Sequence, residues 1–435
     1  MIRRPYVKSA LIAAAIGTQF LSIGSSAHAQ SYRSETPAAP AANPVAAPQK
    51  ADPENAVRPE IGVLLQAAQD LSQANKFAEA HAKIDQAEAV PNKTPYEAYL
   101  IDRVRGPIAA AAGEDAIAAK SLEISLAYDR ITSIEKQRLM PVLASVYFRM
   151  KNYPNAIKWS TAYFKEGGQD DNVRTILSRS YYLTNDFKQA ADELRTQMQV
   201  AEKAGKAPQE DQLRMFAASL LKAGDREGYG LALEKLVAHY PKEDSWASLL
   251  SSLFSKSTFS DRLTLDGYRL KLALGQMEDA KEYLDMSELA MRAGFPAEAK
   301  NVLEAGYKAG MLGTGADAAK HKRLRDAAAK SAADDQKTMA QGEAAANKKA
   351  DGTGLVNLGY AFVTNGQFDK GLELMEKGIA KGGLKQPEEA KLHLALAYAQ
   401  AGKKAEAIEK LKTVQGAGGT AELARYWTLH LNQSK

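Results

Sequence analysis

Five histidines outside the first 29 residues are the side chains best suited to metal binding or acid–base chemistry. They are His81, His239, His321, His393 and His430. Each stands alone in its stretch of sequence, and none forms a recognisable metal-ligand motif with another histidine or a carboxylate. We therefore interpret all five as surface or packing residues.

The other candidate catalytic motifs are also incomplete. Ser255-Lys256 has no base nearby, and the glycine-rich stretch 306–315 follows no apolar strand, which a phosphate-binding loop requires. We expect Asp170-Asp171 and Asp334-Asp335 to lie at helix starts, where acids complement the helix dipole. The chain has no cysteine, which removes thiolate nucleophiles, disulfides and cysteine metal sites. The sequence predicts no enzyme, no metal and no cofactor.

Composition excludes a non-specific nucleic-acid binder. The 435 residues are 45% hydrophobic and 25% charged, with a net charge of +5. Three of the bases lie in the first 29 residues, which hold no acid, so the remainder has 54 bases and 52 acids. Nucleic-acid binders need a larger positive surface. The basic run 320–325 has acidic neighbours and is interpreted as a solvated helix face.

Residues 1–29 have the three parts of a secretory signal. Arg3, Arg4 and Lys8 precede an apolar stretch, and small residues at Ala27 and Ala29 mark cleavage after Ala29. The expected destination is a bacterial periplasm. Arg3-Arg4 resembles a twin-arginine signal, which exports folded chains; threading of the unfolded chain is the favoured alternative. Residues 30–58 contain five prolines among Ala, Ser and Asn, and are predicted to be a disordered linker.

The rest of the chain, 59–435, repeats. Leu355–Phe368 is followed 36 residues later by a similar unit with Gly402 in place of Gly366. The position two residues after each expected turn recurs at intervals of 33–39 residues, with one gap of 70. This marker falls at Phe77, Asp115, Tyr153, Phe187, Arg226, Pro296, Asp335, Phe368 and Lys404. We expect about ten units, with degenerate ones at 245–275 and 317–349; a long single helix is an alternative for the second.

These units resemble the tetratricopeptide repeat, which pairs two antiparallel helices A and B around small and aromatic residues. The resemblance implies an all-α fold, an α-α superhelix, in which each pair shares its apolar faces with its neighbours. The residues that carry it are Phe77, Ala80, Tyr147, Tyr153, Ala156, Tyr181, Phe187, Ala190, Gly224, Gly294, Ala299, Gly359, Gly366, Phe368, Tyr398, Gly402 and Ala407. Glycine and asparagine fit the turn because they accept a left-handed backbone.

The resemblance also implies a binding site, since partners of this family usually lie along a concave face made by the A helices. The matching positions here are Arg138, Phe148, Arg149, Arg179, Tyr182, Arg214, Lys222, Arg292 and Tyr360. Arginines and aromatic residues together are typical of binding hot spots. We expect an interaction scaffold for an extended, somewhat acidic peptide. A polysaccharide-binding protein, or an enzyme without a recognisable motif, remains the alternative.

Overall fold

The computed structural model describes residues 56–433, which form twenty α-helices and no strand. The predicted signal (1–29) and most of the predicted linker (30–58) lie outside these residues. The first ten helices are α1 Pro59–Gln73, α2 Phe77–Glu88, α3 Pro95–Ala112, α4 Asp115–Leu126, α5 Ser133–Arg149, α6 Tyr153–Lys165, α7 Asp171–Leu183, α8 Phe187–Lys203, α9 Glu210–Lys222 and α10 Arg226–His239. The remaining ten are α11 Glu243–Phe254, α12 Thr264–Ala273, α13 Ala280–Arg292, α14 Pro296–Lys308, α15 Ala318–Lys348, α16 Thr353–Thr364, α17 Phe368–Lys381, α18 Pro387–Gln400, α19 Lys404–Lys412 and α20 Thr420–Gln433. A short 3-10 helix, η2 (Asp261–Leu263), precedes α12.

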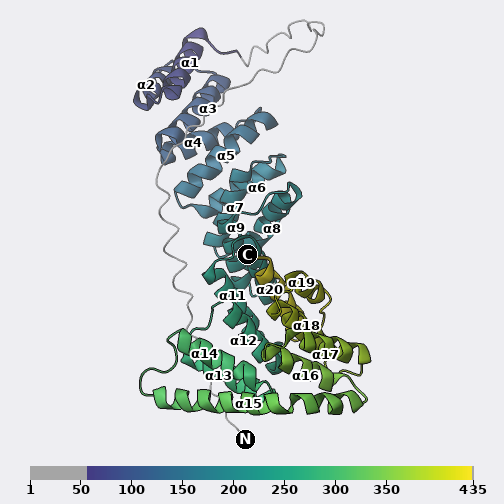
Figure 1. Ribbon diagram of the computed structural model, residues 1–435. Helices are drawn as coiled ribbons and strands as arrows, with labels where there is room; N and C mark the ends of the chain where they lie inside the picture. Colours follow the sequence, from purple (N-terminus) through teal and green to yellow (C-terminus); the bar gives the residue numbers. More distant parts are fainter. Residues whose placement is uncertain (1–55, 434–435) are drawn as a thin grey trace. The chain divides into compact units, whose positions relative to one another are not determined.

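The all-α solenoid fold is confirmed: most helices form antiparallel pairs, and successive pairs pack side by side (Figure 1). No helix among the described residues is long and apolar enough to span a membrane.

One turn geometry is repeated between the helices of each pair. Eight of the nine marker positions are the first residues of α2, α4, α6, α8, α10, α14, α17 and α19. The residue two positions earlier always has a positive φ: it is Asn75, Gly113, Lys151, Asn185, Gly224, Gly294, Gly366 or Gly402. This left-handed residue ends the first helix and lets its last carbonyls accept hydrogen bonds from the turn.

The ninth marker, Asp335, is wrong as a turn position. It lies within α15, a single helix of 31 residues, as the alternative for this segment proposed. The residue two before it is Ala333, which pays a steric penalty in the left-handed conformation, so nothing ends the helix there. Asp334 and Asp335 are therefore inside a helix and not at its start. Asp170 does precede α7, where its carboxylate accepts the Asn172 N–H at 2.8 Å.

Small residues set the closest approach of the paired helices. Ala80, Ala156, Ala190, Ala299 and Ala407 are fully buried. At Gly359 in α16 a Cβ atom would lie 2.6 Å from the Gly371 carbonyl oxygen of α17, so only glycine fits at that contact. The degenerate segment 245–275 is occupied by α11, η2 and α12.

The N-terminal unit is fixed by Arg58, a residue that the sequence places in the linker. Its Nε and Nη2 donate to the two carboxylate oxygens of Glu97 at 2.9 and 3.0 Å, and its backbone N–H donates at 3.0 Å. Glu97 also completes the N-cap of α3 by accepting the Thr94 N–H. These hydrogen bonds, chiefly that from Arg58, lower the pKa of the fully buried Glu97 to about 2.

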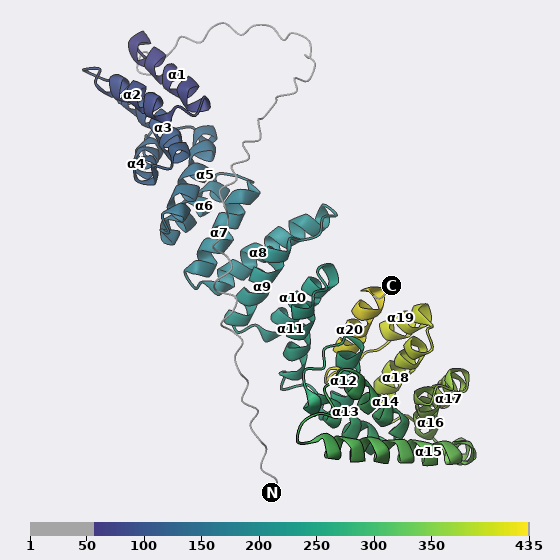
Figure 2. The same cartoon turned by 60° about the vertical axis from the view of Figure 1, so that its left-hand side comes forward.

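The helices from α1 to α9 pack mainly on near neighbours along the chain, and the apolar side chains of α1–α7 form several separate clusters. The helices from α10 to α20 differ, because α20 returns to contact α10 and α12 (Figures 1 and 2). We call α1–α9 the linear part and α10–α20 the closed part. One continuous apolar cluster runs from Ala191 to Leu431 and includes the whole closed part.

Ion pairs and hydrogen bonds fix this return. Arg425 of α20 donates from Nε and Nη2 to the carboxylate oxygens of Glu234 in α10, both at 2.8 Å. Gln433 donates to the Val237 carbonyl at 2.9 Å, and the Ser260 N–H donates to the Gly418 carbonyl at 2.9 Å. The chain therefore covers its last apolar face with helices that precede it by about half of its length.

A buried arginine joins four helices inside the closed part. Arg269 of α12 donates to both oxygens of Glu298 in α14 at 2.7 Å and to Asp266 at 2.6 Å. His393 of α18 lies 2.9 Å from Asp266 through Nε2, and the guanidinium stacks 4.7 Å from the Tyr360 ring centre in α16. We call these five residues the Arg269 cluster.

Charges in the Arg269 cluster hold one another in the ionised state. Burial opposes ionisation of Asp266, but His393 and Arg269 beside it outweigh this and lower its pKa to about 2. Burial likewise opposes the charge on Arg269, and Glu298 outweighs it, so the pKa of Arg269 is raised. A cluster of this kind is strongly destabilised when one partner is removed, because the others stay buried and unpaired.

The replacement Arg269→Met should lower the free energy of unfolding by about 3–5 kcal/mol, since Asp266 and Glu298 lose their buried counter-charge. Urea unfolding followed by circular dichroism measures this. Arg262→Met is the matched control: Arg262 also pairs with a carboxylate, Glu389 at 3.0 Å, but is largely exposed. The control should change stability by less than about 1 kcal/mol. Equal effects of the two replacements would contradict the role of the cluster.

Acid should remove the contribution of Asp266 to stability. Its folded pKa of about 2 lies below the unfolded value, so its contribution is full above about pH 4 and is lost as the pH falls towards 2. The stability difference between the protein and Asp266→Asn should therefore shrink by about 2 kcal/mol between pH 5 and pH 2. Urea unfolding of both proteins across this range measures it, and a difference independent of pH would contradict the assignment.

Candidate partner-binding face

The three A helices α5, α7 and α9 place side chains at equivalent positions on neighbouring pairs. Phe148, Tyr182 and Leu221 each lie five residues before the next helix. Helices α5 and α7 pack directly, and Arg179 of α7 donates to Asp211 of α9 at 3.2 Å. Most of the predicted concave residues therefore lie on adjacent helices, in a group that we call the α5–α9 face.

Aromatic pairs repeat along this face at the turns between helices. The rings of Phe148 and Tyr153 lie 5.7 Å apart between centres, and those of Tyr182 and Phe187 lie 5.4 Å apart. The Lys222 ammonium of the next unit lies 5.0 Å from the Phe187 ring centre and 5.8 Å from that of Tyr182. Burial raises the pKa of Tyr182, so its hydroxyl stays neutral. Such cation–ring contacts orient Lys222 without neutralising it.

Exposed apolar side chains accompany these rings. Met150, Leu183 and Leu221 are 42–48% exposed, and each lies at or next to the end of an A helix. Sequence reasoning missed all three as functional residues. The available signal was their common place near the left-handed turn residue. A turn that faced only solvent would work equally well with polar side chains there, so apolar ones are informative.

The arginines of the face are paired with acids of adjacent units. Arg149 of α5 binds Asp115 of α4, with Nε 3.0 Å from Oδ1. Arg179 binds Asp211 of α9. Arg214 binds Glu210 within α9 at 2.8 Å, and Asp244 of α11 at 3.0 Å. Such partly exposed pairs contribute at most about 1 kcal/mol each. They orient neighbouring units and reduce the positive charge that the sequence alone suggested for the face.

The other three residues predicted to bind a partner lie in different surroundings. Arg138 lies on α5 with its side chain exposed. Arg292 is exposed on α13 of the closed part, 3.9 Å from Glu288. The prediction that Tyr360 contacts a partner is wrong, because its side chain is 1% exposed. It lies in the Arg269 cluster, where α12, α14, α16 and α18 pack together and leave its ring no path to solvent.

Three tyrosines that carry the repeat resemblance have different surroundings. Tyr147 is buried and donates to Glu123 at 2.7 Å, which together with burial raises its pKa to about 12. Tyr398 is half-buried and donates to Glu376 at 2.5 Å. Tyr181 is half-buried.

The histidines occupy separate positions. His393 belongs to the Arg269 cluster, and buried His321 accepts the Gly313 N–H through Nδ1 at 3.2 Å. Within residues 56–433, no three histidine or acidic side chains are grouped so that they could hold a metal ion.

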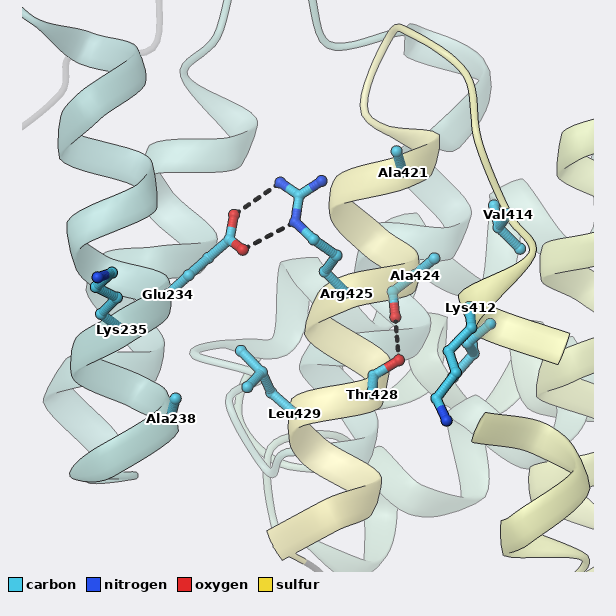
Figure 3. A pocket seen from close by; sticks show the side chains of 11 residues that line it. Glu234, Lys235, Ala238, Lys412, Val414, Ala421, Ala424, Arg425, Thr428 and Leu429 are labelled. Atoms are coloured by element: carbon cyan, nitrogen blue, oxygen red, sulfur yellow. Dashed lines mark hydrogen bonds and ion pairs between the residues drawn. The ribbon is translucent and has the colours of Figure 1, made fainter. Parts of the chain in front are cut away.

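A pocket of about 540 Å³ lies where α20 returns to α10 (Figure 3). Apolar side chains of α19, α20 and the loop between them line it, including Leu411, Val414 and Leu429. The Glu234–Arg425 pair lies at its edge, and Thr428 donates to the Ala424 carbonyl at 2.9 Å. The sequence held no signal for this pocket, because its two sides come from segments almost two hundred residues apart.

Comparisons with known proteins agree with the helix pairs. Residues 356–422, from α16 into α20, match the family described as tetratricopeptide repeat. No curated protein matches the chain in sequence.

The matches among solved structures are distant in sequence and have low TM-scores. A chain of the Naa15/Naa10 complex bound to HypK-THB is 16% identical with a TM-score of 0.29, aligned over 84% of this chain and 58% of that one. This protein thus spans 58% of the length of that chain. Yeast Tom70 is 13% identical with a TM-score of 0.23, over 86% and 94% of the two chains. The Cut9–Hcn1 hetero-tetramer of APC/C is 12% identical with a TM-score of 0.27, over 81% and 86%.

Eight copies of one left-handed turn join antiparallel helices, and the family match covers the two pairs with the plainest repeat sequence. Residues 356–422 are therefore a tetratricopeptide repeat segment, and the turn that marks its helix pairs recurs through the all-α array of the described residues.

Proposed function

We propose that the protein is a periplasmic interaction scaffold that binds an extended segment of a partner polypeptide on the α5–α9 face. Tetratricopeptide repeats are interaction modules, which supports the general role. The observation that carries the site is the contrast between the two parts of the chain. In the closed part, Tyr360 is covered by the chain's own helices, whereas Phe148, Tyr182, Leu221 and Lys222 remain accessible in the linear part.

The chemistry of this face supports a polypeptide partner. Half-exposed aromatic rings provide large contact area at a small cost in side-chain entropy, and the arginines beside them are already oriented by Asp115 and Asp211. A preordered surface of this kind loses little freedom on binding. The periplasmic location rests on the sequence signal in residues 1–29.

Site-specific photo-cross-linking tests the face directly. A photoreactive amino acid at position 148 or 182 should give a covalent adduct with one partner, identified by mass spectrometry, in cells of the source organism. The same amino acid at Leu231, an exposed position of α10 outside the face, is the control. Adducts at 231 with none at 148 or 182 would show that the partner binds elsewhere.

Charge reversal provides a second measurement with the purified partner. Arg149→Glu plus Arg179→Glu places acids beside Asp115 and Asp211, and should weaken binding by at least about tenfold, or about 1.4 kcal/mol. Arg262→Glu plus Arg292→Glu is the matched control, since both arginines are exposed and paired with acids in the closed part. Calorimetric titration measures both, and a larger loss in the control would move the site to the closed part.

Export makes a separate prediction. The protein recovered from a periplasmic fraction should begin at Gln30, as read by mass spectrometry of its N-terminal peptide. Replacing Arg3 and Arg4 by lysine should block export through the twin-arginine route and leave the ordinary route working. A chain that keeps residues 1–29 in the cytoplasm would contradict the proposed location.

A further inference from the structure

The last residues of α5, α7 and α9 hold equivalent positions in three successive units. They are Arg149, Leu183 and Lys222, and each lies four residues before the next helix. Arg149 contacts two positions of the unit before it. Its Nε donates at 3.0 Å to Asp115, the first residue of α4, and its Nη2 donates at 3.2 Å to the carbonyl oxygen of Ala110, five residues before α4.

Lys222 contacts the same two positions of the unit that precedes its own. Its ammonium lies 5.0 Å from the ring centre of Phe187, the first residue of α8, and 5.8 Å from that of Tyr182, five residues before α8. The last residue of a helix A in this region therefore contacts the residue that starts the preceding helix B and the residue five positions earlier. The middle member of the series, Leu183, should follow the same rule.

The rule places Leu183 beside two aromatic rings. Helix α7 packs on both α5 and α6, where the two equivalent positions are Phe148 and Tyr153. We call these two residues the first ring pair, and Tyr182 and Phe187 the second ring pair. The ring centres lie 5.7 Å apart at 60° in the first pair, and 5.4 Å apart at 71° in the second. The two pairs are alike, and all four rings are half-buried.

The two ring pairs differ in the side chain that the next unit presents to them. The second pair receives the Lys222 ammonium. Within residues 56–433, no lysine or arginine side chain lies over either ring of the first pair. Leu183 has no charge and is 48% exposed. Because the face of an aromatic ring attracts cations, the first pair offers an interaction that the chain itself makes at the second.

The charges around the two ring pairs are similar. Asp186 and Asp225 are equivalent carboxylates, each three residues after the end of a helix A, and each caps the following helix B. Lys151 and Lys188 are exposed, and one of them stands beside each pair. Arg149, next to the first pair, already binds a carboxylate of α4. A cation at the first pair therefore meets about the same charges as the lysine at the second.

We propose that the first ring pair binds a lysine side chain of the partner polypeptide, with its ammonium over the rings as the Lys222 ammonium lies over the second pair. Leu183 packs against the alkyl part of that side chain. The inference rests on the proposed function and specifies one residue of its ligand. It differs from the acidic segment expected from the sequence, because the arginines behind that expectation already pair with acids.

Two small probes test the charge. N-acetyl-lysine methylamide carries the ammonium, and N-acetyl-norleucine methylamide has the same butyl chain without it. NMR titration of protein with carbon-13-labelled phenylalanine and tyrosine rings should move the signals of the first ring pair. The dissociation constant should be at least about threefold lower for the lysine probe. Equal affinities would overturn the proposal, because an apolar contact alone would then account for binding.

Matched variants test the position. Leu183→Lys places a cation of the chain itself over the first ring pair, and should weaken binding of the lysine probe there by at least about threefold. Lys222→Met removes the cation from the second ring pair, whose ring signals should then also respond to the lysine probe. Leu231→Lys, at a similarly exposed leucine of α10, is the control and should leave binding unchanged.

All three replaced side chains are exposed, so thermal unfolding should show that the variants stay folded. Unchanged probe binding in Leu183→Lys would overturn the position of the site. A second ring pair that ignores the probe in Lys222→Met would overturn the comparison between the two pairs on which the proposal depends.

The two proposals fail in different ways. A partner cross-linked at position 182, together with equal affinities for the two probes, would keep the scaffold function and refute the lysine site. Absence of any adduct at 148 and 182 would refute the proposed function, whereas lysine-selective binding lost in Leu183→Lys would still support the first ring pair as a cation site.

Discussion

Each helix pair of this chain has apolar side chains on two sides, and only another pair can remove the second side from water. In the linear part the next pair along the chain does so, and the apolar clusters follow one another from Ile61 to Val173. Helix α20 meets the same constraint by packing back on α10 and α12, so the closed part covers its end with its own earlier helices. The 31-residue α15 and the 10-residue α12, which follows the 3-10 helix η2, depart from the regular pairs within this closed part.

The closed part also holds charged side chains in its interior. Arg269 is surrounded by Asp266, Glu298, the Tyr360 ring and His393, which come from four helices. Replacing such a cluster by apolar residues would often cost no stability, so hydrophobic burial alone does not explain it. Its directed hydrogen bonds do fix which faces of α12, α14 and α18 meet. We regard the cluster as the feature that specifies this packing over other arrangements of similar apolar area.

The sequence predicts what depends on neighbours along the chain. Glycine or asparagine at the left-handed position marks nearly every turn, because few other residues adopt that backbone without strain; Lys151 is the exception. For residues 317–349 the sequence allows either a degenerate helix pair or one long helix. The structure has one helix, α15, because Ala333 stands where a turn would need a left-handed residue. The burial of Tyr360 was not predictable, since it depends on α12, almost a hundred residues earlier. The counter-ions of Arg149 and Arg179 were missed because they lie on other units. The exposed residues Met150, Leu183 and Leu221 were missed because exposed leucine or methionine carries no signal by itself.

Free ends matter for how a repeat protein opens. A linear array can lose structure one unit at a time from its end, because each unit is held only by the adjacent one. Here α1 packs mainly on α2 and α3 and is held by Arg58 and Glu97, whereas α20 contacts α10 and α12 as well as α18 and α19. Amide protons should therefore become progressively better protected from α1 towards α9 and then reach one common level across α10–α20, where opening any helix disturbs both of its flanks.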